Sequence, residues 1–318
     1  MDEKVVWLSG HEGRWLRTSD GGSTWFVGRG PGGDSLQFRD VEAFDASTAY
    51  LMSAGSGPAS RIYRTDDGGL SWRLQHTAEH PAAFLDCMAF WDRGTGVVYG
   101  DAVDGRLFIL RTEDGGDSWE RVEAVPAAQP GEGGFAASGT CARTAADGDR
   151  GWIVTGNAER PRLLVTDDRG RSWTAREVPV EGGDGAGLTT LALDGNGGVA
   201  LGGVIGVDTA RGRYGAVTED GGASWRETGA LAMPGPVYGA AGARLEAPMA
   251  RDRSGPPGRV FVAVGPGGMD WSTDGGRTWL QADTATFWAV DFAPSGEGWA
   301  VGPGGRIVRL GLSGGGGG

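Results

Sequence analysis

The sequence predicts an all-β fold, a seven-bladed β-propeller built from four-stranded antiparallel blades. One phrase containing Asp, Gly and Trp recurs six times at intervals near fifty residues, which is the length of one blade. Short runs with the alternation of β-strands separate the copies, and no window has a sustained helical period. Glycine is abundant, with 62 in 318 residues, as frequent tight turns require.

Composition narrows the class of partner. The net charge is -12, and Lys4 is the only lysine. Because no basic stretch offers the charge that phosphate binding needs, we do not expect a nucleic-acid partner. No run of eighteen apolar residues occurs, so we do not expect insertion into a membrane. We expect residues 1–311 to form one propeller domain. We expect residues 312–318, LSGGGGG, to be a Gly-rich flexible tail.

The repeated phrase defines the period. Its copies are RTSDGGSTW (17–25), RTDDGGLSW (64–72), RTEDGGDSW (111–119), VTDDRGRSW (165–173), VTEDGGASW (217–225) and WSTDGGRTW (271–279). The shared aspartates are Asp20, Asp67, Asp114, Asp168, Asp220 and Asp274, spaced 47, 47, 54, 52 and 54 residues apart. The shared tryptophans are Trp25, Trp72, Trp119, Trp173, Trp225 and Trp279. Six copies cannot form one active site, so we assign these residues a structural role.

Each phrase is predicted to be the hairpin between the third and fourth strands of a blade. The Asp carboxylate accepts hydrogen bonds from the backbone of its own turn, and the glycines adopt positive φ. The Trp at the start of the fourth strand then packs against the neighbouring sheet, where a buried indole contributes about 2 to 3 kcal/mol.

The strands can be followed in order through the second repeat. Residues 35–45 (SLQFRDVEAFD) and 48–55 (TAYLMSAG) precede RIYRT at 61–65, the DGG turn and SWRLQ at 71–75. Third strands recur as RWLRT, RIYRT, RLFIL, RLLVT, YGAVT, MDWST and GRIVRL, which makes seven repeats. The first repeat lacks an innermost strand, and the last repeat lacks an outermost strand and the DGG turn. How these two complete each other is left open.

The pattern Ser/Thr-x-Asp-x-Gly-x-x-Trp resembles the Asp-box, or BNR repeat, of sialidase-like propellers. The stretches SLQFRDVEAFD, SRIYRTDDGGLSW, FLDCMAFWD and GEGGFAASGT are more similar to seven-bladed Asp-box propellers of the photosystem II assembly and stability factor type, and in particular to their uncharacterised bacterial relatives. This resemblance implies a non-catalytic scaffold that engages a protein partner. That family is generally exported or lumenal, so it implies a periplasmic or extracellular domain whose leader is absent from this chain; otherwise the chain is cytoplasmic.

Functional residues are expected on the face opposite the Asp-boxes. The long irregular loops lie there, at 28–37, 75–83, 123–137, 179–187, 203–212 and 229–242, and such loops on a rigid scaffold usually carry binding. The innermost strands beginning FRD and FLD bring charged residues to the same channel mouth. The candidate binding residues are Arg39, Asp40, Arg61, Asp86, Tyr99, Asp101, Glu132 and Ser138. Such a set suits a polar ligand, a sugar or a peptide, with Arg39 and Arg61 directed at a carboxylate.

Two alternatives stay open at this point. In the first, the channel is merely solvated, with Arg39 paired to Asp40 or Asp86. In the second, the chain is a sialidase-like or other glycoside hydrolase acting through Arg39, Asp40, Asp86 and Glu132. A sialidase needs a Tyr nucleophile with a carboxylate neighbour, and no such pair can be assigned here. We therefore assign no catalytic residue.

The remaining expectations concern metals, cofactors and thiols. No ligand spacing predicts a metal or a cofactor, and we expect a monomer that binds a protein or a glycan. The two cysteines, Cys87 and Cys141, form no disulfide framework by themselves, and we expect buried free thiols.

Overall fold

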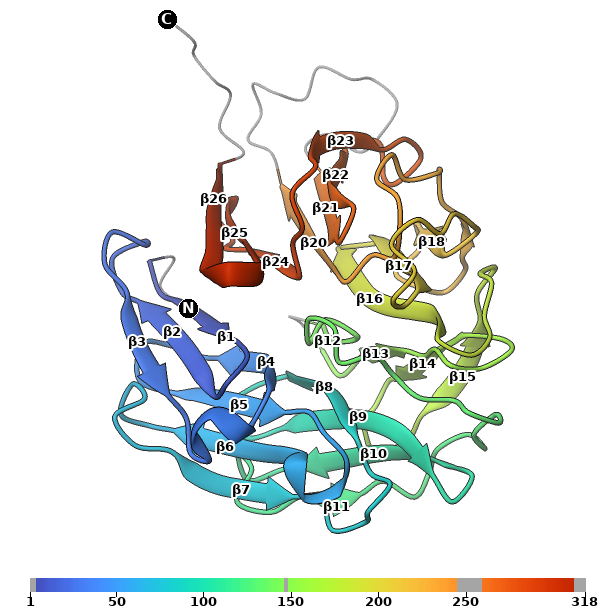
Figure 1. Ribbon diagram of the computed structural model, residues 1–318. Coiled ribbons are helices and arrows are strands. Elements are labelled where there is room, and N and C mark those ends of the chain that lie inside the picture. The colour runs from blue at the N-terminus through green and yellow to red at the C-terminus, as the bar shows by residue number, and fades with distance from the viewer. Residues whose placement is uncertain (1–3, 146–147, 245–258, 312–318) are drawn as a thin grey trace, which may run out of the picture. The chain divides into compact units, whose positions relative to one another are not determined.

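The computed structural model describes residues 4–145, 148–244 and 259–311 (Figure 1). The expected tail at 312–318 lies outside the described residues. By its contacts the chain divides into two compact units. The first unit is Met1–Thr155 with Leu163–Arg176, and the second is Gly156–Arg162 with Glu177–Gly318. The first unit carries the first four sheets described below, apart from one end residue of two strands, and the second unit carries the last three.

The first unit contains four antiparallel sheets. The first sheet is β1 (Val6–Ser9), β2 (Arg14–Thr18) and β3 (Phe26–Arg29). The second is β4 (Phe38–Ala43), β5 (Ala49–Ser53), β6 (Arg61–Thr65) and β7 (Arg73–Thr77). The third is β8 (Leu85–Phe90), β9 (Gly96–Val103), β10 (Arg106–Thr112) and β11 (Glu120–Arg121). The fourth is β12 (Ala142–Thr144), β13 (Gly151–Val154), β14 (Arg162–Thr166) and β15 (Thr174–Glu177).

The second unit adds three antiparallel sheets. They are β16 (Ala186–Asp194), β17 (Gly197–Val204), β18 (Gly215–Thr218) and β19 (Arg226–Glu227); β20 (Gly239–Arg244), β21 (Arg259–Gly265), β22 (Gly268–Ser272) and β23 (Leu280–Asp283); and β24 (Ala289–Phe292), β25 (Glu297–Gly302) and β26 (Arg306–Gly311). Short 3-10 turns are described at Gly33–Ser35, Gly57–Ala59 and Pro303–Gly305.

The seven sheets are the blades of a seven-bladed β-propeller, as the repeat predicted. Strands pair in chain order within every sheet, so each blade is a simple up-and-down meander. The described part of the first blade has three strands and lacks the innermost one, and that of the seventh blade has three and lacks the outermost, also as predicted. In the described part of the chain, no helix is long and apolar enough to cross a membrane.

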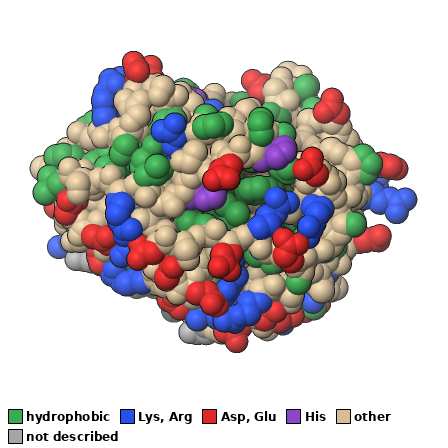
Figure 2. All heavy atoms as spheres, turned by 90° about the horizontal axis from the view of Figure 1, so that it is seen from below, with side chains coloured by type: hydrophobic (Ala, Val, Ile, Leu, Met, Phe, Trp, Pro, Cys, Tyr) green, Lys and Arg blue, Asp and Glu red, His purple; other side chains and the backbone are tan. Residues whose placement is uncertain are grey.

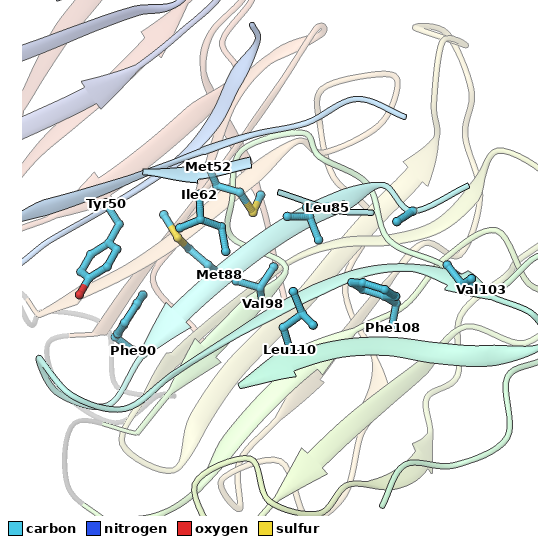
Figure 3. Close-up of a cluster of buried hydrophobic side chains, with 12 residues drawn as sticks. Tyr50, Met52, Ile62, Leu85, Met88, Phe90, Val98, Val103, Phe108 and Leu110 are labelled. Atoms are coloured by element: carbon cyan, nitrogen blue, oxygen red, sulfur yellow. The ribbon is translucent and has the colours of Figure 1, made fainter. Parts of the chain in front are cut away.

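The core lies between neighbouring sheets. In the first unit, Tyr50, Met52 and Ile62 of the second blade pack against Met88 and Phe90 of the third (Figure 3). The Tyr50 and Phe90 rings stack with centroids 4.5 Å apart. All five side chains are buried. Strands that are buried on both faces, such as β5 and β8, therefore contribute to the core of the first unit.

The Asp-box turns have the predicted hydrogen bonds. In the third blade, Ser118 donates to Asp114 through its backbone N (2.9 Å, to Oδ1) and its hydroxyl (2.6 Å, to Oδ2). The Thr112 hydroxyl donates to Asp114 Oδ1 (2.8 Å) and accepts from Gly116 N (2.8 Å). Gly115 and Gly116 have φ of 70° and 84°, which side chains disfavour. The same carboxylate bonds recur at Asp20, Asp67, Asp168, Asp220 and Asp274.

The box tryptophans face protein, as expected. Trp173 and Trp279 are buried, and the other four are half-buried. Trp72 of the second blade packs edge-on against Trp15 of the first, with centroids 5.6 Å apart. The indole N of Trp279, in the sixth blade, donates to the Thr228 hydroxyl at the end of the fifth (3.1 Å). In these two blades the box tryptophan thus joins its turn to the preceding blade.

We expect Asp114→Ala to lower the free energy of unfolding by about 1 kcal/mol, because it removes the acceptor for Ser118 N and the Ser118 hydroxyl, as loss of a side-chain cap does elsewhere. Urea denaturation measures this. The matched control is Asp117→Ala in the same turn, whose carboxylate makes only an exposed ion pair with Arg73. An equal loss in both variants would contradict the role of the box.

The box carboxylates also predict acid sensitivity. Hydrogen bonds, chiefly from the Ser118 hydroxyl, lower the pKa of Asp114 from 3.8 to about 2, and corresponding bonds lower the pKa of Asp20, Asp67 and Asp220 to about 2. A lowered folded-state pKa adds stability above the unfolded pKa and loses it as the pH falls through the folded pKa. We therefore expect the melting temperature to fall between about pH 4 and pH 2, and less steeply for Asp114→Asn than for the wild type.

Candidate functional site

All eight candidate residues lie in the first unit. Arg39 and Asp40 are on β4, Arg61 begins β6, and Asp86, Tyr99 and Asp101 belong to β8 and β9. Glu132 and Ser138 lie in the segment 131–140, which we call the glycine loop, just before β12. The third and fourth blades therefore meet at this loop, and several of the predicted residues contact it.

Two β-bulges set the direction of the acidic side chains. The pairing of β4 with β5 shifts between Phe38 and Asp40, which makes Arg39 the extra residue. The pairing of β8 with β9 shifts in the same way between Leu85 and Cys87, which makes Asp86 the extra residue. A bulge redirects the side chains next to it. This is why the FRD and FLD sequences do not present their residues as regular strands would.

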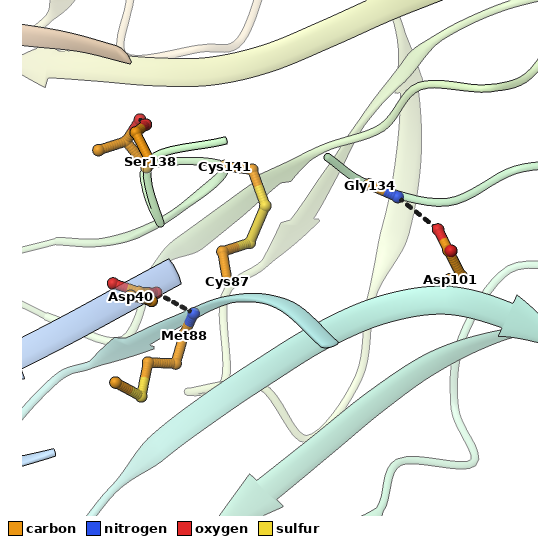
Figure 4. The surroundings of a disulfide bond; sticks show 8 residues. Asp40, Cys87, Met88, Asp101, Gly134, Ser138 and Cys141 are labelled. Carbon is orange, nitrogen blue, oxygen red and sulfur yellow. Dashed lines mark hydrogen bonds between the residues drawn. A yellow bond between two sulfur atoms is a disulfide. The ribbon is translucent and has the colours of Figure 1, made fainter. Parts of the chain in front are cut away.

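Asp40 points into the protein and joins two blades. Its carboxylate accepts a hydrogen bond from Met88 N of the third blade at 2.7 Å (Figure 4). Only 6% of the residue is exposed. Burial raises the pKa of Asp40 well above its usual value, against the opposing effects of the Met88 N bond and of the positive charge of Arg143. Asp40 is thus a connection between strands with almost no surface for a ligand.

Asp86 and Asp101 hold the glycine loop. Gly134 N donates to Asp101 Oδ1 at 3.2 Å (Figure 4). The backbone N groups of Gly134 and Ala136 also donate to Asp86. Burial, and then the neighbouring Asp101, raise the pKa of Asp86 well above its usual value, and burial raises that of Asp101. The second oxygen of Asp86, Oδ2, is buried without a hydrogen-bond partner. A neutral Asp86 carboxyl is therefore favoured.

The glycines of the loop allow this close approach. A Cβ on Gly134 would lie 2.7 Å from Asp86 Oδ2. A Cβ on Gly139, where φ is +74°, would lie 2.1 Å from Asp40 Oδ1. Both distances are shorter than a normal contact, so any side chain would push the loop away from the carboxylates. Glycine at positions 134 and 139 is accordingly required by packing.

The other candidates divide into buried and accessible residues. Glu132 is buried and accepts from Gln129 N at 2.8 Å, and Tyr99 lies inside β9 with no exposed surface. Ser138 is half-buried and shares a hydrogen bond with the Thr140 hydroxyl at 2.6 Å. Arg39 is half-buried at its bulge. The carboxylates that a hydrolase would need are thus inside the protein, whereas an arginine and a hydroxyl reach the surface.

Arg61 is positioned by its own surroundings. Its Nε donates to the Pro58 carbonyl at 2.7 Å, and Nη1 donates to the Tyr63 hydroxyl at 3.2 Å. A guanidinium has five N–H groups, so these two bonds leave others for a ligand. Within the described residues, no group of three or more His, Cys, Asp or Glu side chains could hold a metal ion.

The expectation of free thiols was wrong. Cys87 and Cys141 form a disulfide, with Cα atoms 5.9 Å apart, between β8 and the residue preceding β12 (Figure 4). The two cysteines are 54 residues apart, close to the repeat period, which places them at related positions in successive blades. Sequence reasoning also missed Arg143 on β12, whose charge acts on Asp40. Comparing equivalent positions of the innermost strands could have found both.

We expect Asp86→Asn to make the protein more stable than the wild type near pH 7, because the raised pKa of Asp86 means that ionising it in the folded state costs free energy. A raised folded-state carboxyl pKa adds stability below the unfolded pKa and loses it as the pH rises. The advantage of Asp86→Asn should therefore grow from pH 4 to pH 8 in thermal melts. Asp86→Ala, which removes the acceptor for Gly134 and Ala136, should be destabilising throughout. An Asn variant weakened at every pH would contradict the assignment.

Neither a protein-family model nor a curated protein sequence matches the chain. Solved structures do match. One is YCF48 bound to a D1 peptide, with a TM-score of 0.64 and 18% identity, covering 98% of this chain and 90% of that chain. Another is YCF48 from Cyanidioschyzon merolae, with a TM-score of 0.61 and 16% identity, covering 98% and 92%. At this identity the likeness shows the fold, and at that level it confirms the resemblance to photosystem II assembly-factor propellers.

Proposed function

We propose that this protein is a non-catalytic binding propeller that engages an extended segment of a protein partner on the face opposite its Asp-boxes. The observation that carries the proposal is the division at the candidate site. Asp40, Asp86 and Glu132 are buried and bonded to backbone N groups, while Arg39 keeps exposed surface. A glycosidase needs two carboxyl groups on either side of its substrate, and the carboxyl groups of these three residues are buried.

The likeness to YCF48 supports a peptide as the ligand, because one of the matching structures is a complex with a D1 peptide. In the first unit, Arg39 and Arg61 are the residues we assign to a partner's carboxylate. An arginine fits a carboxylate with two parallel N–H bonds, which gives direction as well as energy. Ser138 supplies a hydroxyl at the edge of the same site.

The surface charge supports a protein partner as well. On the face shown in Figure 2, basic and acidic side chains lie side by side and do not form one continuous basic patch. The net charge of -12 also disfavours a polyanion. We do not propose that the partner of this protein is a photosystem protein, because the D1 peptide is a ligand of YCF48.

The test is fluorescence anisotropy with a labelled D1 peptide as the first probe, followed by an array of overlapping peptides with acidic or free carboxyl ends. We expect Arg39→Ala to weaken binding about tenfold to a hundredfold, because a hydrogen bond to a charged group is lost. Arg73→Ala, which removes an exposed arginine at the start of β7, directly after the Asp-box turn of the second blade, is the matched control and should leave binding unchanged.

A panel of fluorogenic glycosides tests the alternative. Turnover that disappears in Asp40→Ala and Asp86→Ala, both shown to be folded, would establish a hydrolase and overturn the proposal. An array that yields no peptide dependent on Arg39 would also overturn it.

A further inference from the structure

Equivalent positions in three blades make contacts to the next blade. Bulges place Arg39, Asp86 and Thr189 at corresponding positions of β4, β8 and β16. The residue after each bulge crosses to the neighbouring blade by a different chemistry. Asp40 accepts from Met88 N, Thr190 accepts from Ala240 N at 2.9 Å, and Cys87 forms the disulfide with Cys141.

The disulfide is the covalent version of this contact, and it ends at the glycine loop. Cys141 directly follows residues 131–140, and Cys87 directly follows Asp86, which binds the N groups of Gly134 and Ala136. Asp40 lies against Gly139 at the end of the loop. The loop is thus held in its middle by a carboxylate and at its end by a covalent bond, both from β8.

Burial protects this bond. Cys87 has no exposed surface, and only 1% of Cys141 is exposed. Thiol–disulfide exchange needs a thiolate to reach a sulfur atom, so a reductant can act only when the third and fourth blades open locally. The bond is therefore of the structural kind, which forms during folding in an oxidising compartment.

We propose that Cys87–Cys141 is a permanent lock that holds the glycine loop in the shape needed for partner binding and that closes in an oxidising compartment. Two S–H bonds break and one S–S bond forms, and the two electrons and two protons pass to a disulfide-carrying oxidant, which becomes a dithiol. The role in partner binding rests on the proposed function, whereas the lock on the loop does not.

The first test counts free cysteine thiols in the wild-type protein after secretion into an oxidising compartment of the expression host. Alkylation under denaturing conditions should modify no cysteine, and the native protein should resist millimolar dithiothreitol while the urea-unfolded protein is reduced within minutes. Two alkylated cysteines, or equally fast reduction of both states, would overturn the proposal without any variant having to fold.

The second test is hydrogen exchange measured by mass spectrometry on Cys87→Ala/Cys141→Ala. We expect peptides covering residues 131–140 to exchange about tenfold faster or more, with β13 and β14 unchanged. Thr190→Val removes the equivalent contact in the second unit and should leave that loop unaffected. Unchanged loop exchange in the folded cysteine variant would overturn the lock. Faster exchange with no peptide of the array bound by the wild type would count against the proposed function alone.

Discussion

Backbone N groups that donate to buried or turn-bound side chains organise this fold. Each blade is a small sheet of short strands, and a short sheet alone has too little apolar surface to be stable. The Asp-boxes provide acceptors within one hairpin, and in the second and sixth blades they set a tryptophan against the preceding sheet. On the inner strands, Asp40 and Thr190 provide acceptors for the N groups of the following blade. The same kind of bond therefore fixes both the turns and the spacing of neighbouring sheets.

The boxes could be predicted because their chemistry is local. Thr112, Asp114, Gly116 and Ser118 lie within seven residues, so the whole hydrogen-bond set can be read from the sequence. The strand order and the two three-stranded end sheets followed from counting the seven third strands, six of which lead into these phrases. The inner strands were harder. Whether Asp86 faces solvent or the glycine loop depends on a bulge, and one extra residue reverses the direction of every side chain beyond it.

The disulfide illustrates the same difficulty. Cys87 and Cys141 are one repeat apart, but their pairing depends on how two successive blades approach each other, and no local signal records that. Asp86 and Asp101, which their positions on the strands suggested as binding residues, are hydrogen-bond partners of the segment GEGGFAASGT. Of the expected residues, Arg39, Arg61 and Ser138 keep accessible surface, and Asp101, which is also half-buried, is held by Gly134 N. The chemistry at this part of the surface is accordingly that of arginine and hydroxyl groups.

The link between positions 87 and 141 has a consequence for the chain as a polymer. It encloses all of β9, β10 and β11 in a covalent loop, so a single break in the peptide backbone anywhere inside that loop leaves the fragments joined through sulfur. The molecule would keep its full mass on a non-reducing gel after such a cut. The turns and long connections in this stretch can thus be cleaved by a protease without release of either piece.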